Sequence, residues 1–219
     1  MPEIARHLQI SRGRFVVLLR AWKDEPAERG IEPLITPLQH CMTPFTLRCA
    51  TLADLPEIMR LERSGFSSEI QENEFTFADR IRTFPQGCLV LSGEAGRLAG
   101  YLCAELWPYT AEVSQGRFKR DHAASQTHDE NGEEVYISSM VIDPESRGTG
   151  LAKRLFTESL AYICSHFPAL HSAILIVHPE WRGARKIYLA SGFEEIGVVD
   201  AYFTMDGGTA PALVMRGVV

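Results

Sequence analysis

The chain has 219 residues, of which 45% are hydrophobic and 23% charged, and its formal net charge is −6 at pH 7. This is the composition of an ordinary globular protein, and no apolar run approaches the ~20 residues of a membrane-spanning helix. The negative net charge suits a cationic small molecule better than nucleic acid as a binding partner. The five cysteines are scattered without a CxxC pair, which predicts reduced thiols and neither a disulfide framework nor a metal site. We therefore expect a cytoplasmic protein without membrane contact, and its oligomeric state stays open.

Residues 1–44 form a segment distinct from the rest of the chain. Apolar residues between Ile4 and Trp22 have a spacing that fits one amphipathic helix, and four prolines between positions 26 and 44 interrupt the part that follows. The segment is expected to be an extension that packs on the domain or on a partner, or one that is partly disordered. The folded domain is expected over residues 45–219.

Apolar periodicity and turn residues predict the elements of this domain. In chain order they are a strand at Phe45–Ala50, helices at 55–65 and 77–84, strands at 88–92, 98–106 and 135–142, a helix from Leu151, a strand at 172–177, a helix at 181–191, and strands at 197–205 and 212–216. The order predicts a mixed α/β fold with about seven strands and about four helices. The polar stretch 107–134 shows no apolar periodicity, and loops of that length tend to be functional or mobile.

The stretch 135–156 carries the strongest functional signal. An apolar strand ends at an Asp-Pro pair, and a loop containing Gly148 and Gly150 leads into a helix. This layout directs backbone N–H groups and the positive end of a helix dipole at an anion, and glycine lets the main chain approach a phosphate closely. The loop lacks the Gly-Lys-Ser/Thr of a Walker sequence and the third glycine of a dinucleotide fingerprint. An ordinary strand-to-helix turn remains the alternative on the loop alone.

Two motifs carry a resemblance to a known superfamily. The pattern Arg-x-x-Gly-x-Ala of Arg147, Gly150 and Ala152 resembles the acetyl-coenzyme A pyrophosphate loop of the GNAT N-acetyltransferases. Tyr188 begins a Tyr-x-x-x-Gly-Phe sequence like that superfamily's second motif, whose tyrosine usually lies near the coenzyme sulfur. The resemblance implies acetyl-coenzyme A as co-substrate and the GNAT fold, with a mostly antiparallel sheet splayed between strands 4 and 5. The implied coenzyme-binding residues are Met140, Val141, Ile142, Arg147, Gly148, Thr149, Gly150, Leu151 and Ala152.

Within the superfamily, the chain from Phe45 onward is most similar to the arylalkylamine (serotonin-type) N-acetyltransferases. This likeness is carried by Leu61–Phe66, Gly96–Leu98, Leu106–Trp107, and His128 with Gly132. It implies direct transfer of an acetyl group, in a ternary complex, to the primary amine of a small molecule. Polyamine, aminoglycoside and protein N-terminal acetyltransferases are alternatives within the enzyme class, and a non-catalytic acyl-coenzyme A-binding module is the alternative outside it.

The chain departs from that subfamily in the residues for proton transfer. Two histidines of the animal enzymes correspond to Tyr136 and Ser138 on the fourth strand, and neither side chain is a base near neutral pH. The candidates for deprotonating the amine are Glu105, Glu134, His128 and a water bound to Ser138. The sequence leaves the choice among them open.

The remaining roles follow from the resemblance and from the aromatic residues. Tyr188, with an ordinary pKa near ~10, is expected to give a proton to the departing sulfur. Tyr188, Ser138 and His128 are thus the candidate catalytic residues. Phe66, Trp107 and Tyr136 are expected to contact the amine.

Overall fold

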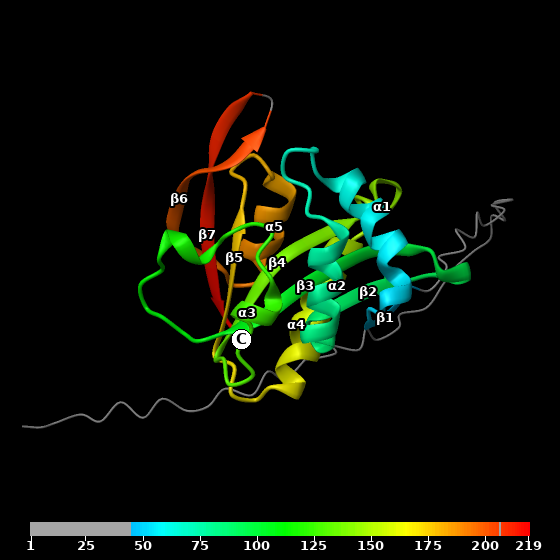
Figure 1. The fold of residues 1–219 in the computed structure, drawn as a ribbon, viewed down its shortest axis with the longest axis horizontal. Coiled ribbons are helices and arrows are strands. Elements are labelled where there is room, and N and C mark those ends of the chain that lie inside the picture. Colours follow the sequence, from blue (N-terminus) through cyan, green and yellow to red (C-terminus); the bar gives the residue numbers. More distant parts are fainter. Residues whose placement is uncertain (1–44, 206) are drawn as a thin grey trace, which may run out of the picture. The chain divides into compact units, whose positions relative to one another are not determined.

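A computed structural model describes residues 45–205 and 207–219, which build one seven-stranded sheet with helices on both faces (Figure 1). The strands are β1 (Thr46–Cys49), β2 (Cys88–Ser92), β3 (Leu98–Trp107), β4 (Glu134–Ile142), β5 (Ser172–Val177), β6 (Glu194–Met205) and β7 (Gly208–Val218). The helices are α1 (Leu55–Gly65), α2 (Glu74–Thr83), α3 (Ala124–Thr127), α4 (Leu151–His166) and α5 (Arg182–Ala190). Strand order is β1-β2-β3-β4-β5-β7-β6, and β4 with β5 is the parallel pair in this sheet.

The predicted α/β fold and its mostly antiparallel, splayed sheet are confirmed, with small differences in the helices. The described residues contain five α-helices instead of about four, because the polar stretch 107–134 contains the four-residue helix α3. Helix α2 begins at Glu74, earlier than predicted, because the side chain of Asn73 accepts a hydrogen bond from the N–H of Thr76 and caps it. The extension and helix predicted within residues 1–44 lie outside the described residues.

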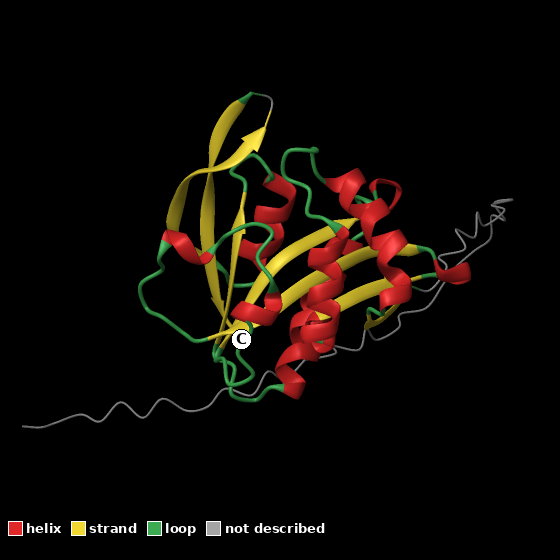
Figure 2. Ribbon diagram, viewed as in Figure 1, coloured by secondary structure: helices red, strands yellow, loops and turns green. Residues whose placement is uncertain are grey.

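The alternation of side chains along the central strands divides the core into two layers. On β2, Leu89 and Leu91 pack into a cluster with residues of α4, α5 and the neighbouring strands. Their neighbours Cys88 and Val90 belong to the cluster under α1 and α2. Figure 1 shows α1 and α2 crossing in front of the central strands, and Figure 2 shows the strands continuing behind them.

A third cluster fills the half of the sheet that α1 and α2 leave uncovered. It joins Trp107 and Phe118 to Tyr136 on β4, and it continues to Ile174 on β5 and Phe203 on β6. The stretch after β3 thus contributes Phe118 to the core, which its polar sequence did not indicate. This cluster forms one wall of the candidate site.

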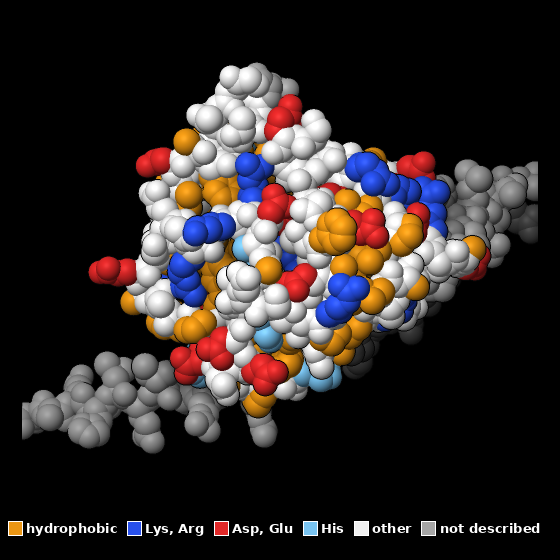
Figure 3. All heavy atoms as spheres, viewed as in Figure 1, with side chains coloured by type: hydrophobic (Ala, Val, Ile, Leu, Met, Phe, Trp, Pro, Cys, Tyr) orange, Lys and Arg blue, Asp and Glu red, His pale blue; other side chains and the backbone are white. Residues whose placement is uncertain are grey.

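The surface of the described residues is mixed in character. On the face drawn in Figure 3, acidic and basic side chains are interspersed with hydrophobic ones, and no single sign of charge dominates. None of the helices in the described part of the chain has the length and apolar character required to cross a bilayer.

Gly132, just before β4, gives a test of this packing. A Cβ at Gly132 would lie 2.7 Å from the backbone nitrogen of Trp107 and 2.8 Å from its carbonyl oxygen. Because backbone atoms cannot move aside as a side chain can, we expect Gly132→Ala to lower the free energy of unfolding by about 1–3 kcal/mol. Gly183→Ala is the control: it lies in α5 with no atom within 4 Å of the added Cβ, and it should cost nothing. Urea denaturation measures the free energy of unfolding of both variants. A Gly132→Ala protein as stable as Gly183→Ala would contradict the packing around Gly132.

Candidate active site

The site is created by the separation of β4 from β5. The two strands pair over four residues, from Glu134 opposite Ser172 to Ile137 opposite Leu175. Strand β4 then continues to Ile142 and β5 to Val177 without pairing to each other. A cavity of about 590 Å³ is lined by the two separated segments, which is the size of a small-molecule site. The backbone edge of β4 beyond Ile137 is therefore open to a ligand.

Most of the predicted coenzyme-binding residues line this cavity, together with the catalytic candidates Ser138 and Tyr188 and with Phe66, which was predicted to contact the amine. The coenzyme-binding residues among them are Met140, Val141, Ile142, Arg147, Gly148, Gly150 and Ala152. Two of the predicted coenzyme-binding residues do not line it: the hydroxyl of Thr149 donates to the carbonyl of Ser146 at 2.6 Å, and Leu151 is buried in the core. The opposite wall comes from β5 and α5, and includes Trp181 and Ile187.

The loop between β4 and α4 has the geometry of an anion site. Gly148 and Gly150 have φ values of 78° and 87°, a region that side chains with a Cβ rarely adopt. Helix α4 starts directly after Gly150, and its first internal hydrogen bond runs from the N–H of Arg154 to the carbonyl of Gly150. The N–H groups of residues 151–153 therefore have no intrahelical acceptor, and they lie at the positive end of a sixteen-residue helix.

A bulge in β4 lies at the centre of the site. The pairing with β3 shifts by one residue, because Cys103 is opposite Ser139 while Ala104 is opposite Ile137. Ser138 is the extra residue, and its hydroxyl donates to the carbonyl of Cys103 at 3.2 Å. A bulge reorients side chains at the point where it occurs. Ser138 and Ser139 line the cavity together with the other residues of 137–142, which form the open edge of β4.

Tyr188 lies on α5 and is almost completely buried against Phe156, with ring centroids 4.9 Å apart. Burial raises the pKa of Tyr188 well above the ordinary value for a phenol. The expectation of an ordinary pKa near ~10 is therefore wrong. The hydroxyl stays protonated at neutral pH.

A second, smaller cavity of about 60 Å³ adjoins the first. The two share Phe66, Ser138, Ser139, Ile176 and Trp181 in their linings. The smaller cavity is lined by aromatic and charged side chains, and its aromatic residues are Tyr136, Tyr202 and Phe203 with the shared Phe66 and Trp181. Phe66 and Trp181 lie in contact, with ring centroids 5.4 Å apart. Of the residues predicted to contact the amine, Phe66 and Tyr136 line this cavity.

A buried carboxylate on α1, Glu62, also lines the smaller cavity. One of its oxygens accepts a hydrogen bond from the Tyr101 hydroxyl, and the other accepts from the N–H of Glu72 at 2.8 Å. The Tyr101 hydroxyl lies 2.9 Å from the hydroxyl of Ser139. Burial raises the pKa of Glu62 to about 7, although these two hydrogen bonds partly oppose the rise. The result is a chain of hydrogen bonds from the bulge of β4 to a carboxyl group that titrates near neutral pH.

A histidine from the stretch after β3 completes the smaller cavity. The two ring nitrogens of His122 face acceptors, the carbonyl of Lys119 at 2.6 Å and the carboxylate of Glu105 at 2.5 Å. Burial opposes a charge on the ring, but the hydrogen bond with Glu105, the negative charge of Glu105 and the carbonyl of Lys119 together outweigh it and raise the pKa of His122. Glu105 also accepts from Thr127 and Trp107, so its role is to hold this stretch in place.

The other predicted candidates lie away from both cavities. Nδ1 of His128 accepts from the N–H of Leu106 at 3.1 Å, its ring stacks on Phe84, and burial lowers its pKa. Glu134 is held by Arg216 at 2.7 Å and is fully buried. Trp107 stacks on Tyr136 at 3.8 Å between centroids and supports the wall from behind. The structure therefore does not bring His128, Glu105 or Glu134 to the cavities.

Comparison with known proteins decides the family. The sequence profile of the Acetyltransferase (GNAT) family matches residues 55–193, well over half of the chain. The chain belongs to the GNAT acetyltransferase family. The matched range contains the whole lining of the larger cavity, together with Glu62 of the smaller one. Tyr202 and Phe203, which also line the smaller cavity, lie beyond the matched range. No curated protein sequence matches the chain.

Solved GNAT structures share the fold at low sequence identity. The GphF GNAT-like decarboxylase in complex with isobutyryl-CoA is 16% identical, with a TM-score of 0.64 over 79% of this chain and 98% of that one. A phosphinothricin acetyltransferase from Sinorhizobium meliloti in complex with AcCoA is 22% identical, with a TM-score of 0.57 over 80% and 89%. The ribosomal-protein-S18-alanine N-acetyltransferase from Escherichia coli is 16% identical, with a TM-score of 0.59 over 80% and 93%. At these identities the likeness concerns the fold.

Sequence reasoning missed the role of Glu62 and the presence of His122, Tyr202 and Phe203 in the site. Glu62 did give a signal, because it lies four residues after Ile58 and seven after Leu55, on the buried stripe of α1. A carboxylate rarely occupies such a position without a partner or a function. The other three residues reach the site through tertiary contacts that no local pattern reveals.

The raised pKa of Glu62 predicts a particular dependence of stability on pH. The unfolded chain releases this proton near the ordinary value of 4.5, whereas the folded protein keeps it until about pH 7. Stability is therefore lost as pH rises from about 4.5 to about 7 and then levels off. We expect Glu62→Gln to match the wild type near pH 5 and to exceed it at pH 8 by up to about 3 kcal/mol. Denaturant melts at both pH values measure this, and a constant difference between the two proteins would contradict the buried, titrating carboxyl.

Proposed function

We propose that the protein transfers an acetyl group from acetyl-coenzyme A to the primary amine of a small arylalkylamine, in a ternary complex. The observation that carries the proposal is the meeting of two cavities at the bulge of β4. The larger one combines an open strand edge with an anion site, and the smaller one combines aromatic walls with a carboxyl that titrates near neutrality. Donor and acceptor can then approach each other from opposite sides of Ser138 and Ser139.

The larger cavity suits the coenzyme in two respects. The unpaired edge of β4 around Met140 offers backbone groups to the amides of a pantetheine arm, and the glycine loop with Arg147 offers donors to a diphosphate. Complexes of GphF with isobutyryl-CoA and of the S. meliloti enzyme with AcCoA support acyl-coenzyme A as the donor class. When bound, acetyl-coenzyme A supplies the thioester that the amine attacks.

Glu62 is the proposed proton acceptor. With Glu62 ionised, the hydroxyl of Ser139 donates to Tyr101 and Tyr101 donates to the carboxylate, so a proton taken up at Ser139 is passed to Glu62. A pKa of about 7 is near the optimum for a general base at neutral pH. Tyr188 donates a hydrogen bond to the departing sulfur, because its raised pKa keeps the phenol protonated. Ser138 remains with its hydroxyl on the carbonyl of Cys103 and shapes the bulge.

The lining of the smaller cavity favours an aromatic monoamine over the alternatives. The smaller cavity, with about 60 Å³, has room for the amine end of such a molecule, and ionised Glu62 attracts its ammonium group. Phe66 and Trp181, which line both cavities, can contact its ring. The exposed side chains of Lys119 and Arg120 belong to the same lining and repel the second charge of a polyamine. Glu72 is held by Arg80 in an ion pair with distances of 2.5 and 2.7 Å, so Glu62 is the carboxyl left to accept a proton.

The decisive experiment measures thiol release from acetyl-coenzyme A with a panel of amines. We expect turnover with tryptamine, tyramine or phenethylamine, and little with spermidine or lysine. In wild type, kcat/KM should rise with pH and show an inflection near 7, because Glu62 must be ionised to accept the proton. Glu62→Gln should remove that inflection and lower kcat/KM by about 10²-fold or more.

His128→Asn is the matched control, because an amide oxygen can replace Nδ1 as acceptor for the N–H of Leu106. It should keep both the rate and the inflection. If His128→Asn lost activity while Glu62→Gln stayed active, the acceptor of the amine proton would be His128 and not Glu62. Coenzyme binding without thiol release for any amine would favour a non-catalytic acyl-coenzyme A-binding module, and preferred turnover of spermidine would favour a polyamine enzyme.

Tyr188→Phe tests the second proposed role. The change removes one hydroxyl from a buried ring and leaves the packing against Phe156 intact. We expect unchanged affinity for coenzyme A and a kcat reduced by about 10²-fold, because the departing sulfur loses its hydrogen-bond donor. Titration calorimetry and steady-state kinetics separate the two effects. An unchanged kcat would show that the phenol serves packing alone.

A further inference from the structure

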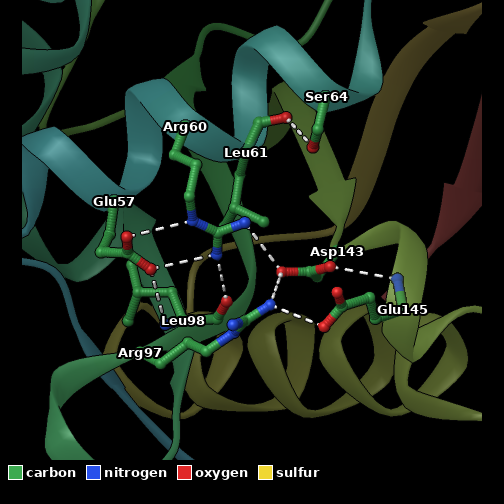
Figure 4. A network of polar contacts seen from close by, with 8 residues as sticks. All are labelled: Glu57, Arg60, Leu61, Ser64, Arg97, Leu98, Asp143 and Glu145. Carbon is green, nitrogen blue, oxygen red and sulfur yellow. Dashed lines mark hydrogen bonds and ion pairs between the residues drawn. The ribbon is translucent and has the colours of Figure 1, made fainter.

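Asp143 is the last residue before the glycine loop, and its carboxylate is the centre of an ion-pair network (Figure 4). One oxygen accepts from Arg60 at 2.8 Å and from Arg97 at 3.4 Å. The other accepts from the N–H of Glu145 at 3.1 Å and caps the turn over Pro144–Ser146. Asp143 itself is only 3% exposed. The start of the loop is thus fixed through this side chain.

Arg60 connects that carboxylate to two other elements. Its guanidinium donates twice to Glu57, at 3.0 Å each, and once to the carbonyl of Leu98 at 3.0 Å. Glu57 in turn accepts from the N–H of Leu98 at 3.2 Å. Four of the five N–H groups of the planar guanidinium are thus engaged, which fixes its orientation. Arg60 therefore links α1, the first residue of β3 and the end of β4 through one side chain.

The rest of the loop has few further contacts: Glu145 accepts from Arg97 at 2.7 Å, and the Thr149 hydroxyl donates to Ser146 within the loop. In the backbone, the N–H of Ser146 donates to the carbonyl of Asp143 at 2.8 Å, and the N–H of Arg147 donates to the carbonyl of Pro144 at 3.3 Å. Residues 147–150 are exposed, and Gly148 and Gly150 have no side chain with which to contact the domain. The orientation of the loop relative to α4 consequently depends on how Asp143 is held.

We propose that Arg60, through its ion pair with Asp143, is a positioning residue for the diphosphate of the coenzyme. The proposal rests on the proposed function, because it assigns the anion at the glycine loop to the coenzyme. Arg60 acts in two ways: it sets the direction in which the loop presents its N–H groups, and it neutralises a carboxylate beside a negatively charged ligand. Burial opposes ionisation of Asp143, but the N–H of Glu145 and Arg60 together keep its pKa lowered, so the carboxylate remains charged.

The test compares two probes, coenzyme A and pantetheine, because pantetheine has the same thiol arm without the diphosphate and nucleotide. Titration calorimetry on the full chain should show that Arg60→Met lowers the affinity for coenzyme A about tenfold and changes the affinity for pantetheine little. Arg48→Met is the matched control, because the Arg48–Asp54 ion pair resembles the Arg60–Asp143 ion pair. The nitrogen–oxygen distances are 2.7 and 2.8 Å, the arginine side chains are 38% and 34% exposed, and the aspartate side chains are 10% and 4% exposed. It lies on β1, away from the loop, and should leave the ratio of the two affinities unchanged.

Asp143→Asn distinguishes an effect of loop position from an effect of charge alone. It also tests the proposal if Arg60→Met does not fold. The change removes a negative charge beside the diphosphate, so a pure charge effect would strengthen coenzyme A binding, whereas a loosened loop would weaken it. Weaker coenzyme A binding with pantetheine unchanged supports the positioning role. Stronger binding, or an equal loss for both probes, overturns it while the proposed function stands. A wild-type protein that binds no coenzyme A overturns both.

Discussion

The end of the β4–β5 pairing is the constraint on which the candidate site depends. A backbone edge inside a protein needs hydrogen-bond partners, and β4 has none from β5 after Ile137. At the end of the same strand, α4 presents N–H groups that have no acceptor within the helix. Both sets of unpaired groups lie along one cavity. A ligand with amides along its length and an anion at one end would satisfy them together, so the fold itself selects for the shape of an acyl-coenzyme A.

The bulge at Ser138 lies where the two cavities are joined. Residues 137–142 line the larger cavity along the open edge of β4, and Ser138 and Ser139 line the smaller cavity as well. Ser139 also contacts Tyr101, whose hydroxyl donates to Glu62. The hydrogen-bond chain to Glu62 therefore begins where the two cavities meet. It links the open strand edge to a titrating carboxyl on α1.

The sequence predicted the elements and the coenzyme side of the site because those features are local. The glycine loop, the start of α4 and the motif around Tyr188 are each readable within a few residues, and the structure brings all three to the larger cavity. The lining of the smaller cavity is assembled from residues far apart in the chain. His122 reaches the site through a hydrogen bond to Glu105 on β3, and Tyr202 and Phe203 reach it through the packing of β6. The register shift at Ser138 and the environment that raises the pKa of Glu62 are likewise properties of the assembled sheet.

The energetics of Glu62 bear on why the fold retains an ionisable group there. One function of its carboxylate is structural, because it accepts the N–H of Glu72 and so fixes the segment after α1. A glutamine could accept the same hydrogen bond and would not have to be ionised at a buried site. A purely structural role therefore leaves unexplained a side chain that destabilises the folded state as pH rises through neutrality. Buried groups with strongly shifted pKa values occur preferentially at functional sites, where titration is itself useful. The position of Glu62, in the lining of the smaller cavity and at the end of a hydrogen-bond chain from the bulge, favours this explanation over the structural one.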